Sequence, residues 1–553
     1  MNKLLAILLC ACCLNGWAQT AQELLTDGRN TDNITTYGMG YDMKRYSPLK
    51  QINTASLKRL VPVCSMSLAM DLGEQSQPMI YNGVMYVTNV KWTFAIDIAT
   101  GKQIWRTAVD YDPGTPRVVC CGVSNKGAAI YNGKLYRVTL DAYVLALDMK
   151  TGKEVWKSKF AEWKDGYSSI VAPLIANGVV VTGMSGAEFG VRGFLDGWDP
   201  ETGKALWRRY TIPGPGEPGS ETWPAEGEAY KRGGGSTWIT GSYDPELDLM
   251  YWGTGNASPW NTRYRGKDSL YSASVLAVRP KTGEIVWHYQ FTPDDSFDYD
   301  GVNENVIADL SVDGAPRKVI LHADRNGFFY VIDRTNGKLL RAFPFGKVNW
   351  ASHVDMKTGR PVETDVRKRL IAGEEVELWP AFGVKNWAQM SFNPKSGMVY
   401  MNTIHFPQMF KLVPIDYKAG TRYTGAESRA FPRAPGDDAE GFQVAMDPLT
   451  GKFKWQNKLT DFVSQAGMLS TDGGLVFTGR MTGEFEALDE ASGKVLWSFQ
   501  TGSGINAPPV TYTYKGRQYI TVLSGLAGDS RGRKASPGVP AGGAVWTFAL
   551  LPE

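Results

Sequence analysis

A short acidic stretch, residues 294–300 with the sequence DDSFDYD, gathers carboxylates densely enough to do chemistry. In an extended segment alternate side chains share a face, so we expect Asp298 and Asp300 to project together. Two neighbouring carboxylates repel each other unless one is protonated or a cation lies between them, and hard cations take oxygen ligands. The stretch therefore predicts a cation site, with a solvated acidic loop as the plainer alternative.

Two adjacent cysteines, Cys120 and Cys121, are the second unusual feature. A disulfide between neighbours closes a tight ring that fits poorly with ordinary disulfide and trans-peptide geometry, and such strain is usually kept for a functional site. The alternatives are two reduced cysteines in the core, or pairing of one of them with Cys64. Three cysteines beyond residue 18 are too few for a disulfide framework.

The N-terminal residues 1–18 hold one lysine near the start, a short apolar run and a small-residue end at Ala18, which predicts a secretory signal peptide. Cleavage would leave residues 19–553 as a single domain, and we expect this domain to be periplasmic. Because LLCAC loosely resembles a lipobox with Cys12 as the lipidated residue, a lipoprotein is the less favoured alternative. No other stretch is long and apolar enough to predict a membrane span.

Composition narrows the class of protein. A formal net charge of +3 over 553 residues indicates neither a nucleic-acid partner nor an acidic tail. The content of 61 Gly, 30 Pro, 18 Trp and 25 Tyr suits a large, turn-rich all-β protein.

One phrase recurs along the chain, for example AIDIATGKQIW and ALDMKTGKEVW. Alternating apolar residues, a turn built on Asp and Thr-Gly-Lys, and a second short strand ending in an aromatic predict a β-hairpin. The glycines of seven such repeats stand at positions 101, 152, 203, 283, 337, 451 and 493. Their commonest separation, about fifty residues, is the length of a four-stranded propeller blade. With room for a hidden blade around NPKSGMVYMN, the repeats predict an eight-bladed β-propeller.

The tryptophan that ends most repeats has a structural explanation, because a large aromatic can fill the gap between adjacent sheets. We therefore interpret these tryptophans as packing residues rather than as a binding stripe. A ring of blades leaves an axial pocket lined by loops from every blade, which is a natural place for a cofactor.

Several motifs resemble those of the quinoprotein alcohol dehydrogenases, which use pyrroloquinoline quinone (PQQ), and the resemblance covers nearly all of the chain after residue 18. They are the adjacent cysteines, SGAEFGVRG, GGGSTW, YWGTGNASPWN, TPDDSFDYDGVNE, HADRNGFFYVIDR and the tryptophan-docking repeats. The segment FPFGKVNWASHVDMKTGRPVE looks most like the ethanol-type branch of the family. Each string alone is weak, but their number and order make the match specific.

The resemblance implies which residues hold the cofactor. The ring of Cys120 and Cys121 would cover one face of PQQ, and Trp238 would stack on the other. Arg325 would hydrogen-bond the reactive quinone carbonyl, although pairing with a nearby carboxylate is the plainer role for an arginine. The polar rim of the cofactor would come from Gln75, Lys126, Thr139, Ser185, Gly186, Ala187, Ser236 and Asn386.

The family pattern also assigns the metal ligands, to Glu188, Asn256, Asp298 and Asp300, and it makes Asp298 the general base. An aspartate at the position of Asp300 is associated with members that use a lanthanide. Three negative charges, before the cofactor's own carboxylate is counted, suit a trivalent ion better than a divalent one. We therefore expect a lanthanide(III) ion, with Ca²⁺ as the alternative.

Three positions depart from the family pattern. Gln75 stands where a glutamate is usual, Lys126 where an arginine is usual, and Gln465 where many relatives have a tryptophan near the substrate. Because lysine is a point charge and not a bidentate fork, the cofactor would be held more loosely. An amide in place of an indole makes the pocket roomier and more polar, so we expect a bulkier or more functionalised alcohol than ethanol.

The implied reaction is hydride transfer from an alcohol carbon to the quinone, with Asp298 removing the hydroxyl proton and the metal acting as a Lewis acid. Because no C-x-x-C-H motif occurs, the electrons are expected to pass to a separate carrier, a soluble cytochrome c. The competing hypothesis is a non-catalytic propeller scaffold of the cell envelope. It explains the repeats but not the paired cysteines, the acids and Arg325 together. The sequence leaves the preferred alcohol open, and a homodimer also remains open.

Overall fold

The structure is a computed structural model that describes residues 19–69, 73–120, 122–431, 436–526 and 538–552. The expected signal peptide, residues 1–18, and Cys121 lie outside the described residues.

Within the described ranges, eight sheets contain four or five strands each. The first four sheets are β3 (Met79–Tyr81), β4 (Val84–Thr88), β5 (Trp92–Asp97) and β6 (Gln103–Ala108); β7 (Ala129–Tyr131), β8 (Lys134–Val138), β9 (Tyr143–Asp148) and β10 (Glu154–Lys159); β11 (Leu174–Ala176), β12 (Val179–Gly183), β13 (Phe194–Trp198) and β14 (Ala205–Tyr210); and β15 (Ser242–Asp244), β16 (Leu249–Gly253), β17 (Ser274–Val278) and β18 (Ile285–Gln290). The next four are β19 (Val306–Val312), β20 (Ala315–Ala323), β21 (Phe328–Asp333) and β22 (Leu339–Pro344); β26 (Ser391–Asn393), β27 (Met398–Ile404), β30 (Gly441–Met446) and β31 (Phe453–Leu459); β1 (Tyr46–Ser47), β32 (Leu469–Thr471), β33 (Leu475–Gly479), β34 (Glu484–Asp489) and β35 (Val495–Gln500); and β36 (Val510–Tyr514), β37 (Arg517–Ser524), β38 (Ala544–Leu550) and β2 (Leu60–Ser67).

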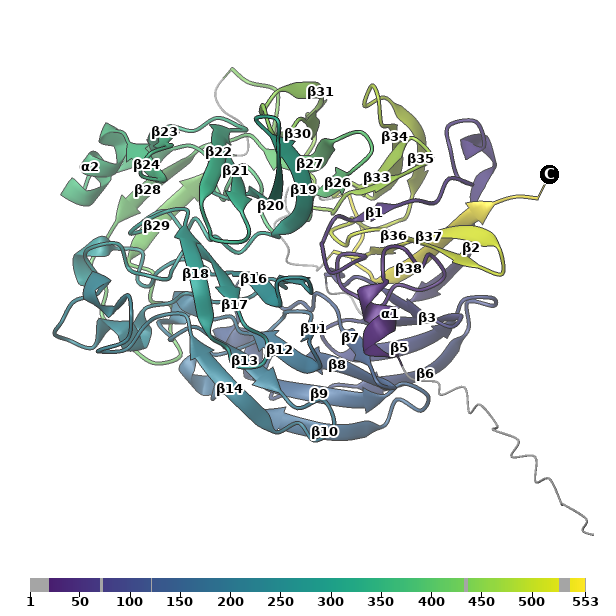
Figure 1. Ribbon diagram of the computed structural model, residues 1–553, viewed down its shortest axis with the longest axis horizontal. Coiled ribbons are helices and arrows are strands. Elements are labelled where there is room, and N and C mark those ends of the chain that lie inside the picture. The colour runs from purple at the N-terminus through teal and green to yellow at the C-terminus, as the bar shows by residue number, and fades with distance from the viewer. Residues whose placement is uncertain (1–18, 70–72, 121, 432–435, 527–537, 553) are drawn as a thin grey trace, which may run out of the picture.

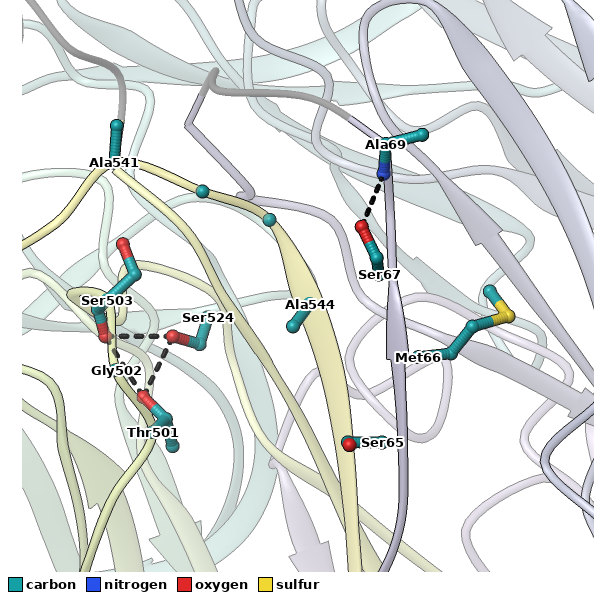
Figure 2. Close-up of a pocket in the computed structure, with 12 residues that line it drawn as sticks. Ser65, Met66, Ser67, Ala69, Thr501, Gly502, Ser503, Ser524, Ala541 and Ala544 are labelled. Carbon is teal, nitrogen blue, oxygen red and sulfur yellow. Dashed lines mark hydrogen bonds between the residues drawn. The ribbon is translucent and has the colours of Figure 1, made fainter.

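The remaining elements are small. Two short sheets, β23 (Ala351–Asp355) with β24 (Arg360–Glu363), and β25 (Val376–Leu378) with β28 (Gln408–Leu412) and β29 (Ala426–Ala430), lie beside α2 (Asp365–Ala372) in an excursion of the chain (Figure 1). The other α-helix described is α1 (Ala21–Leu25). None of the described helices combines the length and apolar character needed to cross a membrane.

Figure 1 shows the sheets arranged around a common centre, with β7 and β11 near it and β10 and β14 at the periphery. The repeated phrase forms the outer hairpin of a sheet, as its sequence predicts. In the first repeat the carboxylate of Asp97 accepts hydrogen bonds from the backbone N–H and the hydroxyl of Thr100, both at 2.8 Å. Gly101 then adopts φ +68°, which favours glycine. The expected all-β fold is confirmed.

The repeated tryptophans contact the next sheet along the chain. Trp105 donates a hydrogen bond from Nε1 to the carbonyl of Met149 at 3.1 Å, and its indole lies on Gly152. In five further pairs an aromatic ring lies on the glycine of the next repeat in the same way. They are Trp156 on Gly203, Trp207 on Gly283, Trp287 on Gly337, Phe343 on Gly451 and Trp455 on Gly493. On β2 the side chain of Cys64 lies against Gly101 of the first sheet, so the series of contacts returns to its start.

One of the eight sheets lacks the repeated phrase, and it is not the sheet that the sequence predicted around NPKSGMVYMN. NPKSGMVYMN forms the β26–β27 hairpin of the same sheet that carries Gly451, so it is not a separate blade. The additional sheet instead joins the two ends of the chain, because β2 pairs antiparallel with β38, with Leu60 opposite Leu550. Apolar side chains fill the space between neighbouring sheets; at this closure Phe485 of β34 packs on Phe548 of β38 with ring centroids 5.4 Å apart.

Candidate active site

The connections between strands place the predicted residues at one end of the sheets. In a four-stranded antiparallel sheet, the link from the second to the third strand and the link from the fourth strand to the next sheet leave at the same end. The β12–β13, β16–β17 and β20–β21 links carry Glu188, Asn256 and Arg325. The links that follow β14 and β18 carry Trp238 and the acidic stretch 294–300.

The acidic loop is shaped by its own second aspartate. The buried carboxylate of Asp295 accepts hydrogen bonds from the backbone N–H of Phe297 at 2.9 Å and of Tyr299 at 2.8 Å. The chain therefore turns around Asp295, and Asp298 adopts φ +64° at the turn. Asp298 and Asp300 then face a common partner, Arg325. Its Nη1 lies 2.5 Å from Oδ2 of Asp300, and its Nη2 lies 3.3 Å from Oδ2 of Asp298.

Asp300 is the most enclosed of the three acids expected at the metal, Glu188, Asp298 and Asp300, which are called the acidic cluster below. Its Oδ1 accepts the backbone N–H of Asn256 at 2.5 Å, and its Oδ2 also accepts the indole N–H of Trp238 at 3.3 Å. A Cβ on Gly255 would lie 2.6 Å from Oδ1 of Asp300 and 2.7 Å from Oγ of Ser236, so this approach requires glycine. Gly255 is a residue that no prediction singled out, although it lies in the YWGTGN motif.

Burial and the charges of neighbouring acids both raise the pKa values of Glu188 and Asp298. Burial raises the pKa of Glu188, and the charge of Asp300 raises it further. Burial also holds the pKa of Asp298 well above its ordinary value of 3.8; Arg325 opposes this shift, whereas Asp300 and Glu188 add to it. A contact with the side chain of Cys120 lowers the pKa of Glu188, which places Cys120 beside the acids. The disulfide with Cys121 lies outside the described residues and stays a prediction.

The donor set fits a hard cation. In the described ranges no three acidic, histidine or cysteine side chains stand close enough to hold a metal ion by themselves. Even so, Glu188, Asn256, Asp298 and Asp300 offer only oxygen donors. Within the described residues, Oδ1 of Asn256 and Oδ1 of Asp298 are buried without a hydrogen-bond partner. A cation would satisfy both atoms and relieve the repulsion between the carboxylates.

The cofactor residues form a second group beside this cluster. Lys126 is buried, and its Nζ lies 3.0 Å from Oε1 of Gln75, 5.4 Å from the ring centroid of Trp238 and 3.7 Å from that of Trp387. Trp387 was missed from the sequence, although it directly follows the expected residue Asn386. Two indoles, an amide and an ammonium group on one side of the acids suit a flat, anionic, aromatic ligand.

The other expected rim residues are less closely joined to the cluster. Ser185, whose buried Oγ has no hydrogen-bond partner among the described residues, precedes the turn of Gly186 and Ala187 that presents Glu188. Thr139 instead donates to Asp141 within its own turn, at 2.5 Å.

Asn386 donates to the carbonyl of Phe382 at 2.8 Å, and the neighbouring Gly383 packs against Arg325. Gln465 is half-buried in the β31–β32 link, which leaves its sheet at the same end as the acids.

Comparison with known proteins identifies the family of the chain. The model of the PQQ glucose/ethanol/alcohol dehydrogenase β-propeller domain matches residues 35–348 and 441–520. The chain is 40% identical to quinoprotein alcohol dehydrogenase PedH of Pseudomonas putida over 99% of its own length and 96% of that protein, and 39% identical to quinoprotein ethanol dehydrogenase of Pseudomonas aeruginosa over 96% and 92%. Among solved structures, a europium-containing methanol dehydrogenase superposes with a TM-score of 0.90 at 36% identity, covering 96% of this chain and 100% of the other.

Proposed function

This chain belongs to the PQQ-dependent quinoprotein alcohol dehydrogenases, and we propose that it oxidises an alcohol to an aldehyde or ketone at the cluster of Asp298, Asp300 and Arg325. The observation that carries the proposal is the contact of one guanidinium with both carboxylates, next to the indole of Trp238. Arg334 also holds two acids, Asp244 and Asp309, so such a pair alone does not exclude a scaffold. The indole of Trp238 and the buried Oδ1 atoms of Asn256 and Asp298, unsatisfied within the described residues, distinguish the Arg325 cluster and favour a functional site.

In the proposed oxidation of the alcohol, each residue of the site has a separate role. Bound PQQ supplies the hydride acceptor. Asp298, which would also contribute an oxygen to the cation, takes the hydroxyl proton of the alcohol on its carboxylate. Arg325 directs a fixed positive charge toward the position where negative charge grows during the reaction. Trp238 would stack on one face of the cofactor, and the predicted ring of Cys120 and Cys121 would cover the other face.

For the metal we propose a lanthanide(III) ion held by Glu188, Asn256, Asp298 and Asp300, with Ca²⁺ as the alternative. Support comes from the three carboxylates: burial raises the pKa of Glu188 and of Asp298, and the charge of Asp300 raises both further. A trivalent cation compensates three negative charges better than a divalent one.

Further proposals concern the whole protein. We propose that its eight larger sheets are the eight blades of the propeller and that the indole-on-glycine contacts are its docking repeat; the return of these contacts to Gly101 supports a closed ring. The signal-like residues 1–18 support a periplasmic location. The lack of C-x-x-C-H in the sequence supports a separate soluble cytochrome c as electron acceptor.

The test is reconstitution of the purified protein with PQQ and either La³⁺ or Ca²⁺. We expect a bound chromophore in the absorbance spectrum, and reduction of an artificial electron-accepting dye in the presence of alcohols. Primary, secondary and aromatic alcohols with each metal would define the substrate. No bound chromophore and no dye reduction with any alcohol would favour the scaffold instead.

A further inference from the structure

Behind the acidic cluster lies an ion pair that the proposed chemistry does not use. Lys385 and Glu304 meet at 2.8 Å between Nζ and Oε2, and their side chains are 0% and 1% exposed. Moving two such charges out of water costs several kcal/mol each, on the order of what their attraction returns. An apolar pair of similar volume would stabilise this site about as well, so stability alone does not explain the pair.

Glu304 joins two segments that the candidate site depends on. It lies on the link after β18, four residues beyond Asp300. While Oε2 accepts from Lys385, Oε1 accepts the backbone N–H of Met390 at 2.7 Å. One carboxylate thus fixes both ends of the segment 385–390 to the acidic loop.

That segment presents two groups to the cofactor side. Lys385 also donates to the carbonyl of Asn386 at 3.3 Å, and Asn386 is the residue whose side chain is expected at the cofactor rim. The next residue, Trp387, provides the ring that lies 3.7 Å from Nζ of Lys126. A third link comes from Asn303, whose Nδ2 donates to the carbonyl of Ala323 at 2.7 Å and to that of Lys385 at 3.4 Å.

We propose that Glu304 and Lys385 are positioning residues, which hold Asn386 and Trp387 at the correct distance from the acids for cofactor binding. The inference rests on the proposed function, since it assumes that the cofactor lies between Trp387 and the acidic cluster. Neither residue touches the reacting atoms. Partners of this kind, one step behind the binding groups, typically change affinity or activity 10–100-fold when removed.

The experiment compares two isosteric variants of the full chain, E304Q and D244N. Asp244 provides the matched control because it pairs with Arg334 at 2.6 Å with both side chains 4% exposed, at the opposite end of the sheets. Both variants should lower the urea midpoint. Only E304Q should weaken PQQ binding, about ten-fold or more in a tryptophan-fluorescence titration, and only E304Q should speed hydrogen exchange at residues 386–390. Equal PQQ affinity in E304Q and the unaltered chain would overturn the proposal.

A double variant separates positioning from the harm of an unpaired buried charge. In E304Q/K385M no charge is left uncompensated, so the urea midpoint should recover while the affinity for PQQ stays low. Recovery of affinity in the double variant would overturn the positioning role. If the unaltered chain itself binds no PQQ with either metal, the proposed function fails. In that case hydrogen exchange alone tests the positioning role of Glu304. Unchanged hydrogen exchange at residues 386–390 in E304Q overturns the inference, and faster exchange supports it.

Discussion

Arg325 donates a hydrogen bond from Nη1 to Oδ2 of Asp300 at 2.5 Å, and this contact joins the link after β20 to the link after β18. Its second nitrogen, Nη2, reaches Asp298 at 3.3 Å. A planar guanidinium, with several donors in fixed directions, is preorganised to address two carboxylates at once. Asp298, the expected base, and Asp300, the expected additional metal ligand, therefore both contact the positive charge of Arg325.

Replacing Arg325 by lysine keeps the charge but removes this double contact. We expect R325K to lose turnover roughly 100-fold, because a positioned donor for developing charge is typically worth that much, while the apparent KM changes little. Dye-linked steady-state kinetics measure both constants. The matched control is R317K, at an exposed arginine of β20, which should behave like the unaltered protein. Full turnover in R325K would remove Arg325 from the reaction.

Asp300 should decide which metal supports activity. In D300S the site loses one of its three negative charges, so we expect lanthanide-supported turnover to fall by at least about ten-fold, while some calcium-supported turnover remains. Parallel assays with La³⁺ and Ca²⁺, and Tb³⁺ luminescence as a direct measure of ion binding, test this. Unchanged lanthanide dependence would contradict the assignment of the metal.

The local parts of the fold could be predicted because short-range chemistry decides them. Asp97 and Thr100 close their own turn, so the hairpins can be read from eleven residues. The pairing of β2 with β38 could not be predicted, because it joins the two ends of the chain and neither strand carries the repeat. NPKSGMVYMN was assigned to the wrong sheet for a related reason: a hairpin sequence specifies its two strands but not the sheet that receives them.

The candidate site likewise contains residues that could be predicted from the sequence and residues that could not. Asp298, Asp300 and Arg325 lie in motifs specific enough to name from the sequence, and the structure brings them together. Trp387 and Glu304 were missed because their roles arise only from contacts between distant segments. In a chain with 18 tryptophans, nothing in the sequence separates Trp387 from the packing tryptophans until its ring is found beside Lys126.

The adjacent cysteines can be tested without reference to activity. If Cys120 and Cys121 are bonded, alkylation of the mature, unreduced protein should modify only Cys64. The peptide that contains both cysteines should be lighter by two hydrogens than after reduction. The C121S variant should retain PQQ less tightly, because the flat cover over the cofactor is lost. Alkylation of all three thiols, or full cofactor retention in C121S, would show the pair to be incidental.

Glu74 should make stability depend on pH. Burial raises the pKa of this carboxyl to about 8 from its ordinary 4.5, opposed by a hydrogen bond from Asn89, so the folded protein holds it protonated at neutral pH. A pKa raised by folding contributes stability that is complete below about pH 4.5 and is lost as the pH rises toward 8. Urea midpoints of E74Q should therefore fall less between pH 5 and pH 8 than those of the unaltered protein. Parallel curves for the two proteins would contradict the assignment.

The contact between sheets can be tested with two glycines of one sheet. Gly133 and Gly152 both have positive φ, +73° and +70°, so alanine at each costs about 1 kcal/mol of backbone strain. A Cβ on Gly152 would also lie 2.5 Å from Cε3 of Trp105, whereas a Cβ on Gly133 meets nothing within 4 Å. We therefore expect G152A to lose about 1–3 kcal/mol more free energy of unfolding than G133A, as measured by urea denaturation. Equal losses would mean that the Trp105 indole yields freely and that the indole-on-glycine contact does not fix the spacing of the sheets.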